Sequence, residues 1–349
     1  MNVLSLFDGM SCGRITLSEL GIPVKKYYAS EVDKFAIKAT MQNFPDTIQL
    51  GDVRELEVSR LDKIDLIIGG SPCTNLSMSG KRKGLSTKEG MEVLDLKTYL
   101  ELKENGFEFE GQSYLFWEYI RIYHELIERG DNPKFFLENV EMGKKWESVF
   151  NETIGRKGIH INSALVSAQN RRRIYWTDIH DDIPQPEDRG ILLKDILEEE
   201  VDEKYFLSDK MIECLKGRVK TEKFSPVQFS PIKLPYEQKA RTINTRLFKM
   251  GDNDNYIQVD NVKKNIRSID DKAHTLLATS HKGAMANGMT LVDNGNFRIR
   301  RLTPTECARL QTVPEWYVWD GISDTQRYKM LGNGWNIETI KHIFKYIEK

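Results

Sequence analysis

Short apolar segments alternate with amphipathic segments through the first half of the chain. The run Ile64-Asp65-Leu66-Ile67-Ile68 is followed by two glycines, a pattern typical of a buried parallel strand. In the segments between such runs, the spacing of apolar residues fits helices with one buried face. This alternation predicts an α/β fold with a doubly wound sheet. The predicted strands are 3–7, 26–31, 64–68 and 134–138, and the predicted helices are 14–20, 34–43 and 114–129.

The later segments predict a smaller inserted domain. Residues 149–154 are predicted to be helical, and 161–166 and 173–177 are predicted strands that would pair antiparallel. After 179, prolines and Asn/Asp clusters replace the alternation, and helical patterns return at 303–310, 324–331 and 336–346. We therefore expect a first domain at 1–178, an inserted domain at 179–299, and a segment at 300–349 that returns to the first domain. Residues 80–112, rich in Lys, Glu and Gly, are expected to form a long loop that acts as a mobile lid.

Composition is that of an ordinary globular protein, with 349 residues, 40% of them hydrophobic, and a net charge of −1. Between residues 203 and 300, however, 18 Lys and Arg stand against 11 Asp and Glu. Such a local excess suits a phosphate backbone, and a solvated surface is an equal alternative. No membrane helix or signal peptide is expected, and the four cysteines lack metal-ligand spacing. We expect free thiols, no metal, and a cytoplasmic location.

The most informative residue is Cys73, which follows the predicted strand 64–68 through Gly69-Gly70-Ser71-Pro72. Ligands of open α/β sheets bind at the carboxyl ends of the strands, so this thiol is expected at the mouth of a site. A thiolate there can attack an electrophilic carbon. A lone cysteine in this position is more often a small buried hydrophobic residue, so the assignment depends on the rest of the chain.

Three turns at other strand ends indicate a nucleoside-type cofactor. Phe7-Asp8-Gly9-Met10-Ser11-Cys12 leads from a strand into a helix without the GxGxxG pattern of dinucleotide binding. Glu31, at the end of the second strand, can accept the hydroxyl groups of a ribose. Asp52, in Gly51-Asp52-Val53-Arg54, can accept the amino group of an adenine. Each acid alone is more simply a helix cap, but together they favour the cofactor.

Two further motifs supply acid–base and cationic groups. The apolar run Phe135-Phe136-Leu137 leads into Glu138-Asn139, where Glu138 can act as an acid or hold a ring nitrogen, or can cap a helix instead. In the following strand, Arg171 and Arg173 are predicted to share one face and Arg172 the other. Two guanidinium groups on one face suit an anion or a carbonyl oxygen, and a basic surface cluster is the alternative.

Taken in order, these motifs resemble those of the DNA (cytosine-5)-methyltransferases. The resemblance extends to Gln169-x-Arg171-x-Arg173, to the segment 301–311 and to Gly332-Asn333-Gly334-Trp335, and it covers about 1–178 and 298–349. It implies a Rossmann-like, S-adenosylmethionine-dependent methyltransferase sheet in which 179–299 is the target-recognition domain. The first turn, Thr74-Asn75 and Trp335 depart from the common bacterial pattern, and several motifs are similar to those of animal de novo DNA methyltransferases.

The resemblance also implies a mechanism and a substrate. Double-stranded DNA would present a flipped-out cytosine, and the residues implied to act on it are Cys73, Glu138, Asn139, Arg171 and Arg173. The residues implied to bind S-adenosylmethionine, with S-adenosylhomocysteine as product, are Phe7, Asp8, Gly9, Met10, Ser11, Cys12, Glu31, Val32, Asp52, Val53, Arg54, Pro72, Asn333, Gly334 and Trp335. The loop 74–90 would close over the DNA. Candidate base readers in the insert are Arg241, Asn244, Arg246, Lys249 and Lys282.

Several alternatives stay open at this stage. An RNA cytosine-5-methyltransferase would share the fold, although its Cys-Phe-Thr signature is missing here. A non-catalytic DNA-binding homologue would be expected to lack the nucleophile or the cofactor residues. A dehydrogenase is disfavoured by the glycine pattern and by the thiol at the strand end. The enzyme would work in the cytoplasm of a bacterial or phage-infected cell, either beside a cognate restriction endonuclease or as an orphan.

Overall fold

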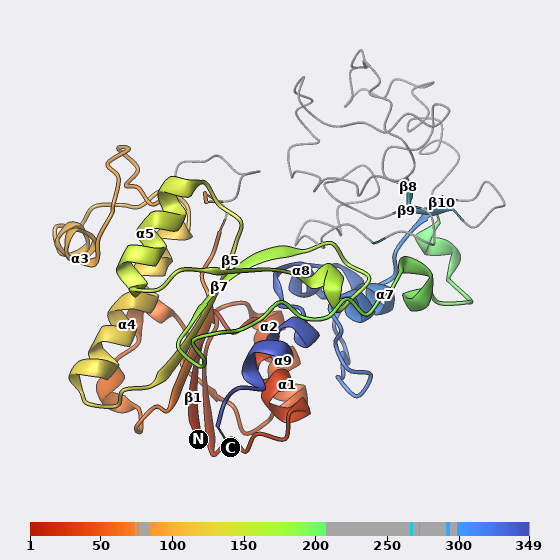
Figure 1. Cartoon of the computed structure of the whole chain (residues 1–349), viewed down its shortest axis with the longest axis horizontal. Coiled ribbons are helices and arrows are strands. Elements are labelled where there is room, and N and C mark those ends of the chain that lie inside the picture. Colours follow the sequence, from red (N-terminus) through yellow and green to blue (C-terminus); the bar gives the residue numbers. More distant parts are fainter. Residues whose placement is uncertain are drawn as a thin grey trace, which may run out of the picture.

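A seven-stranded sheet forms the centre of the protein, which we describe from a computed structural model (Figure 1). The structure describes residues 1–73, 75–76, 84–206, 266–267, 272, 291–293 and 299–348. The strand order is β3-β2-β1-β4-β5-β7-β6, and β7 runs in the opposite direction to the other six strands. The strands are β1 (Asn2–Leu6), β2 (Lys26–Ser30), β3 (Ile48–Gln49), β4 (Leu66–Gly70), β5 (Lys134–Val140), β6 (Ile159–Asn162) and β7 (Arg172–Thr177).

Helices cover both faces of this sheet, as the alternating pattern predicted. The helices are α1 (Cys12–Glu19), α2 (Lys34–Asn43), α3 (Leu96–Glu104), α4 (Phe116–Glu128), α5 (Lys144–Ile154), α7 (Pro304–Leu310), α8 (Asp324–Asn333) and α9 (Ile337–Phe344). Adjacent residues of a strand point to opposite faces, so Ile68 packs in the core with α1 and α9, while Ile67 packs in the core with α4. The C-terminal helices therefore complete a layer begun at the N-terminus (Figure 1).

Two sequence-based boundaries differ from the structure by four residues or more. Helix α5 begins at Lys144, five residues before the prediction, because Trp146 and Phe150 bury the same helix face beneath an exposed, lysine-rich first turn. Strand β6 ends at Asn162, because the Asn162 carboxamide accepts a hydrogen bond from the Ala164 backbone N–H (3.1 Å) and starts a 3₁₀ turn. The pairing of β6 with β7 is antiparallel, as expected.

The segment expected to be a long loop contains a helix. Asp95 caps α3 by accepting a hydrogen bond from the Thr98 backbone N–H (2.8 Å), and Tyr99 and Leu102 bury one face of the helix. Residues 77–83, together with Thr74, lie outside the described residues, and with them lies much of the predicted closing loop.

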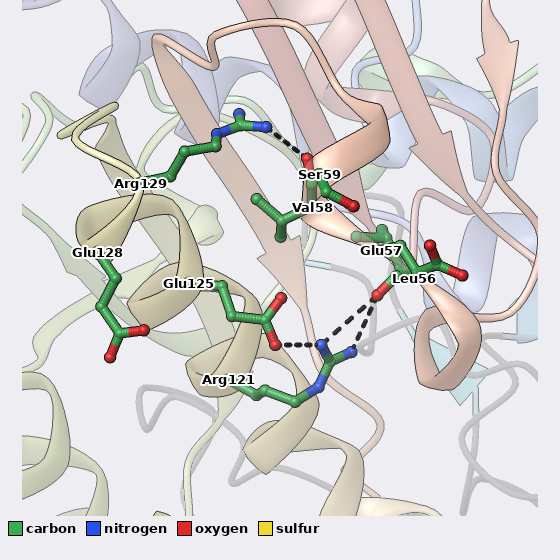
Figure 2. A pocket seen from close by; sticks show the side chains of 8 residues that line it. All are labelled: Leu56, Glu57, Val58, Ser59, Arg121, Glu125, Glu128 and Arg129. Atoms are coloured by element: carbon green, nitrogen blue, oxygen red, sulfur yellow. Dashed lines mark hydrogen bonds and ion pairs between the residues drawn. The ribbon is translucent and has the colours of Figure 1, made fainter.

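Two arginines fasten the chain between β3 and β4 to helix α4 and the turn after it (Figure 2). This connection contains two 3₁₀ turns, η1 (Val53–Glu55) and η2 (Val58–Arg60). Arg121 of α4 donates hydrogen bonds to carbonyl oxygens of η1 and of the residue after it, and Arg129 does the same at η2. The connection is thereby held against α4 and the turn after it, although its own regular structure is limited to the two 3₁₀ turns.

Residues 179–206 pack against the first domain. Ile179, Ile183, Leu193 and Ile196 share a core with α1 and α9, and the Glu198 backbone N–H donates to Glu306 of α7 (2.9 Å). The domain division at 178 and 299 stays a prediction, and this packing favours a boundary after 206. Between residues 207 and 301, the strands that the structure describes are β8 (Ile266–Arg267), β9 (Leu291–Asp293) and β10 (Ile299–Arg301), which form a second sheet. The candidate base readers lie outside the described residues. Among the described helices, none is long and apolar enough to cross a membrane.

Candidate active site

The nucleophile candidate and the acid candidate lie at the ends of neighbouring strands. Gly70, the last residue of β4, is in register with Glu138 of β5, and Cys73 follows three residues later. The glycine is required here, because a Cβ atom at position 70 would lie 3.1 Å from Glu138 Oε2 and 2.8 Å from Trp335 Nε1. The backbone of β4 therefore passes directly beside the Glu138 carboxylate.

An ion pair joins Glu138 to Arg173. The Glu138 Oε1 and Arg173 Nε atoms are 2.9 Å apart, and only about a tenth of each side chain is exposed (10% and 11%). Antiparallel pairing brings the residues together, since Arg173 of β7 is in register with Val140, two residues beyond Glu138. A carboxylate this buried needs a compensating charge, and the guanidinium supplies it.

The Cys73 thiol is partly exposed and close to these charges. Burial raises the pKa of the Cys73 thiol; the positive charge of Arg173 and the weaker influence of Arg171 oppose this rise, whereas the Glu138 carboxylate adds to it. Cys12 and Cys307 are buried, and burial raises the pKa of Cys12 to about 12. Cys73 is therefore the one cysteine of the described part of the chain that a substrate can reach.

Asn139 fastens the loop that carries the thiol. Its Nδ2 donates hydrogen bonds to the backbone oxygen of Ser71 (3.2 Å) and to the Ser71 hydroxyl (3.0 Å), and its Oδ1 accepts one from the Val140 N–H (2.8 Å). Both Asn139 and Ser71 are buried. No sequence pattern pointed to Ser71, which works as a short polar partner on the first residue after β4.

Arg171 lies deeper inside the protein than Arg173. Its side chain is buried, and its Nη2 donates to the carbonyl oxygens of Gly332 (3.3 Å) and Gly334 (2.8 Å). Burial and the neighbouring Arg173 charge lower the pKa of Arg171 to about 9. Arg172 is exposed, as the strand alternation predicted. Arg171 thus ties β7 to the end of α8.

The turn after β1 has an unusual backbone. Phe7, Gly9 and Ser11 have φ angles of 59°, 58° and 61°, in the left-handed region. Gly9 faces open space, because a Cβ atom at this position would meet nothing within 4 Å, and its N–H donates to Glu31 Oε2 (2.7 Å). The N–H groups of Asp8, Gly9 and Ser11 are all bonded within the protein, so what this turn offers a ligand is close approach at the open side of Gly9.

Several predicted cofactor residues turn their side chains away from the open edge. The side chains of Met10, Ser11, Cys12 and Val53 are buried. These four side chains are therefore not exposed at the open edge.

Asp8 is buried by the same turn. Its carboxylate accepts hydrogen bonds from Tyr27 Oη (2.8 Å) and from the Ser11 hydroxyl. Burial outweighs these bonds and raises the pKa of Asp8 to about 6. Tyr27 was missed from the sequence because it reads as an ordinary residue of a strand; only the packing shows its hydroxyl aimed at Asp8.

Glu31 and Asp52 organise the next two strand ends. Glu31 Oε1 accepts the N–H groups of Val32 and Asp33 (2.8 Å each), while the Val32 side chain is 68% exposed. Asp52 caps η1 through the Arg54 N–H (2.9 Å) and pairs with the Arg54 guanidinium, and this pairing lowers the pKa of Asp52. Val32 is exposed and the Gly9 turn faces open space, so neither position is covered by packed neighbours.

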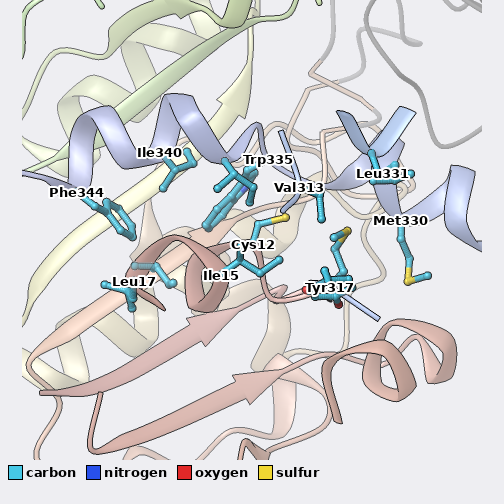
Figure 3. Close-up of a cluster of buried hydrophobic side chains, with 14 of the residues drawn as sticks. Cys12, Ile15, Leu17, Val313, Tyr317, Met330, Leu331, Trp335, Ile340 and Phe344 are labelled. Atoms are coloured by element: carbon cyan, nitrogen blue, oxygen red, sulfur yellow. Dashed lines mark hydrogen bonds between the residues drawn. The ribbon is translucent and has the colours of Figure 1, made fainter. Parts of the chain in front are cut away.

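The C-terminal motif packs onto the first turn. Trp335 is buried edge-on against Phe136, with ring centroids 5.2 Å apart, and Figure 3 shows it beside Cys12 in the core. A Cβ at Gly334 would lie 3.2 Å from Cys12 Sγ, so the two motifs are in close contact. Gln311 of the 301–311 segment donates to the Gly334 carbonyl (3.1 Å) and orients it, a role that the sequence did not predict. Asn333 is exposed.

The carboxyl edge of this doubly wound sheet combines a partly exposed cysteine, a paired buried carboxylate and an open turn after β1. This combination fits a methyltransferase that works by covalent catalysis. Comparison with known proteins agrees. Residues 1–349 match the family model described as C-5 cytosine-specific DNA methylase. The chain therefore belongs to the C-5 cytosine-specific DNA methylase family, and it is a DNA (cytosine-5)-methyltransferase of the S-adenosylmethionine-dependent kind.

Individual relatives are distant but cover nearly the whole chain. The type II methyltransferase M1.ScrFI of Lactococcus lactis subsp. cremoris is 27% identical over 98% of this chain and 76% of its own length. The orphan methyltransferase M.SPRI of Bacillus phage SPR is 24% identical over 99% and 97%. In structure, the Entamoeba histolytica methyltransferase EhMeth superposes with a TM-score of 0.66 at 15% identity, over 99% of this chain and 97% of that one. The last likeness supports the fold alone.

Proposed function

We propose that Cys73 is the nucleophile of this DNA methyltransferase and that Glu138 and Arg173 act together on the target cytosine. The observation that carries the proposal is the buried Glu138–Arg173 pair beside the only reachable thiol of the described chain. A cytosine stacked in a duplex cannot present C6 to this thiol, so the base would enter the site flipped out of the helix.

The proposed reaction begins at the thiol. Cys73 loses its proton and forms a bond from sulfur to C6, a step that the positive charge of Arg173 favours by stabilising the thiolate. The electron pair displaced from the C5–C6 bond moves toward N3 and O2. Glu138 would donate a proton or a hydrogen bond at N3 and accept one from the exocyclic amino group, while Arg173 would hydrogen-bond O2.

The second half of the reaction restores the thiol. S-adenosylmethionine, when bound, supplies the methyl group that C5 accepts. Loss of the C5 proton to a base then restores the C5–C6 double bond and expels the Cys73 sulfur, so that 5-methylcytosine is released. Asn139 would keep the Cys73 loop at a fixed distance from Glu138 throughout, because both its Nδ2 bonds end on Ser71.

The cofactor is proposed to lie along the ends of β1, β2 and β3. Backbone groups of residues 7–12 would surround its methionine part, with Pro72 and residues 333–335 closing the other side. Glu31 would bind the ribose, Val32 would cover one face of the adenine, and Asp52 with the backbone of Val53 would bind its edge. Support comes from the open Gly9 turn and the exposure of Val32.

For Arg171 we propose a supporting role. Two roles are open to this arginine: a contact with a DNA phosphate, or a contact that holds the site together. Burial of the guanidinium and its bonds to the Gly332 and Gly334 carbonyls favour the second. Target recognition is proposed to reside in 207–298, the part of the insert that carries most of its basic residues. The relatives include a type II and an orphan enzyme, so a partner endonuclease and an orphan role both stay open.

One experiment tests the function as a whole. The purified protein is incubated with tritiated S-adenosylmethionine and, side by side, with unmethylated phage DNA and total tRNA; the DNA product is then sequenced after bisulfite treatment. Label in DNA at cytosines of one recurring short sequence is the expected result. Label confined to tRNA would replace the proposed substrate with RNA, and bound cofactor without label in either would contradict catalysis.

A further inference from the structure

A fully buried carboxylate on α4 lies at the centre of a polar network away from the thiol. Glu118 has no exposed surface, and it accepts hydrogen bonds from Arg121 Nε (2.8 Å), from Lys103 Nζ (2.5 Å) and from the Tyr99 hydroxyl. Lys103 and Tyr99 belong to α3, in the lobe that follows the Cys73 loop. Burying a carboxylate with three donors is costly unless the arrangement fixes something in place.

What the network fixes is visible at the other end of Arg121. After pairing with Glu118 and with Glu125 (2.7 Å), its guanidinium still donates to the backbone carbonyls of Val53 (3.2 Å) and Leu56 (3.4 Å). Val53 is the first residue of the η1 turn and Leu56 is the residue after it; Figure 2 shows the contact between Arg121 and Leu56. Two carboxylates hold the guanidinium fork, so its remaining N–H groups have little freedom to move.

The η1 turn is also the turn proposed to bind adenine. Asp52 caps it and Val53 is its first residue, and the Val53 side chain is anchored in the core. The Val53 carbonyl oxygen accepts one hydrogen bond from within the turn, from the Leu56 N–H (3.4 Å), and one from outside it, from Arg121 (3.2 Å). Arg121 is therefore the contact that ties this peptide to helix α4.

We infer that Arg121, held by Glu118, is a positioning residue for S-adenosylmethionine, because it fixes the Asp52–Val53 backbone that the adenine would contact. The inference rests on the proposed placement of the cofactor. It assigns Arg121 no contact with either substrate, so its effect should appear in cofactor affinity and not in the chemical step.

A groove between α4 and residues 56–59, drawn in Figure 2, contains a second arginine that provides a matched control. Arg129 lines it beside Arg121, follows the same helix, and donates to the carbonyls of Leu61 (2.9 Å) and Asp62 (3.0 Å) as well as to Val58. It pairs with Asp131, as Arg121 pairs with Glu118. Its carbonyl partners lie at and after η2, where no cofactor residue is proposed. A general loosening of the connection would affect both arginines alike, and a positioning role would affect only Arg121.

The test is the affinity of the full-length protein for S-adenosylmethionine, measured by isothermal titration calorimetry for wild type, R121K, R121Q, R129Q and D52A, together with KM and kcat on DNA. R121K keeps a cation beside Glu118 but loses the fork that reaches both carbonyls, so it separates positioning from charge burial. We expect R121K and R121Q to weaken cofactor binding about tenfold, the size of one charge-assisted hydrogen bond. The kcat at saturating cofactor and the KM for DNA should stay within about twofold of wild type, and R129Q should bind the cofactor normally.

The outcomes separate this inference from the cofactor placement beneath it. Normal binding by D52A would overturn the proposed placement and the inference with it. Weak binding by D52A but normal binding by R121K and R121Q would overturn the inference alone. Equal weakening in R121Q and R129Q would also overturn it, since the effect would then be a general loss of order in the connection.

Discussion

Arg173 Nε lies 2.9 Å from Glu138 Oε1 in an ion pair across two antiparallel strands, in a position where both side chains are nearly buried. The pair explains how one site can hold a carboxylate and a thiol together. Glu138 by itself would disfavour a thiolate at Cys73, and the guanidinium compensates for that charge. The arrangement also gives Glu138 a fixed direction, because one of its oxygens is committed to Arg173.

Replacing Cys73 with alanine should abolish methyl transfer to DNA while leaving S-adenosylmethionine binding unchanged, because the bond to C6 cannot form without sulfur. Tritium transfer and calorimetry measure the two properties. The control is C307A, which removes a buried thiol elsewhere and should retain activity within about twofold, at a stability cost of about 1 kcal/mol. Normal turnover by C73A would rule out Cys73 as the nucleophile.

Replacing Arg173 with glutamine should move the pH dependence of Cys73 alkylation to higher pH. Arg173 is the strongest influence that lowers the pKa of this thiol, so its loss leaves burial and Glu138 opposed only by weaker influences such as Arg171. The rate of reaction with iodoacetamide against pH measures the shift, and methyl transfer at pH 7.5 should fall by roughly 10²-fold. R172Q, at the exposed neighbouring position, should leave both profiles in place. An unshifted alkylation profile in R173Q would contradict the electrostatic role.

Replacing Gly70 with alanine should reduce kcat/KM by about tenfold or more, because the added methyl group would press on the Trp335 indole and on the Glu138 carboxylate. G143A provides the comparison, since nothing lies within 4 Å of a Cβ there and the backbone is in an ordinary extended conformation. Initial rates on DNA, with thermal unfolding as a check on folding, decide the matter. Equal activity of G70A and wild type would show that the close approach of β4 to Glu138 is not required.

Replacing Asp8 with asparagine should change how stability depends on pH. The pKa of Asp8 is raised to about 6 in the folded protein, against about 4 in an unfolded chain, so the folded state binds this proton more tightly. The free energy of unfolding of the wild type should therefore fall as pH rises from about 4 to about 6 and level off above. D8N does not lose stability in this way. Its free energy of unfolding, measured relative to that of the wild type, should therefore rise by about 1 kcal/mol from pH 5 to pH 7.5.

Urea unfolding at the two pH values measures that difference, because contributions from all other groups cancel between the variant and the wild type. D320N, which alters an exposed carboxylate, serves as the control and should follow the wild type at both pH values. A constant difference between D8N and wild type would mean that Asp8 is not protonated more readily in the folded state.

The fold class and the positions of the candidate site residues could both be predicted from local sequence. Strands such as 64–68 are apolar on both faces because helices cover both, and this leaves a continuous hydrophobic run that a single sequence displays. Residues that follow such runs must lie at one edge of the sheet, which is why Cys73 and Glu138 could be expected together. The boundaries of α5 and β6 failed, because exposed lysines hid the start of the one and a side-chain cap ended the other.

Other features depended on contacts between residues far apart in the chain. Arg171 and Arg173 look equivalent in the sequence, yet one is buried beneath the Gly332–Gly334 carbonyls and the other pairs with Glu138. Asp8 and Tyr27 likewise carry no local sign of their hydrogen bond. Buried strands followed by turn residues could be recognised locally, and so the sequence by itself determined that Cys73 and Glu138 lie at neighbouring strand ends. Only the tertiary structure decided which charges are buried and with which partners, because the cost of burying a charge depends on atoms that other segments bring to it.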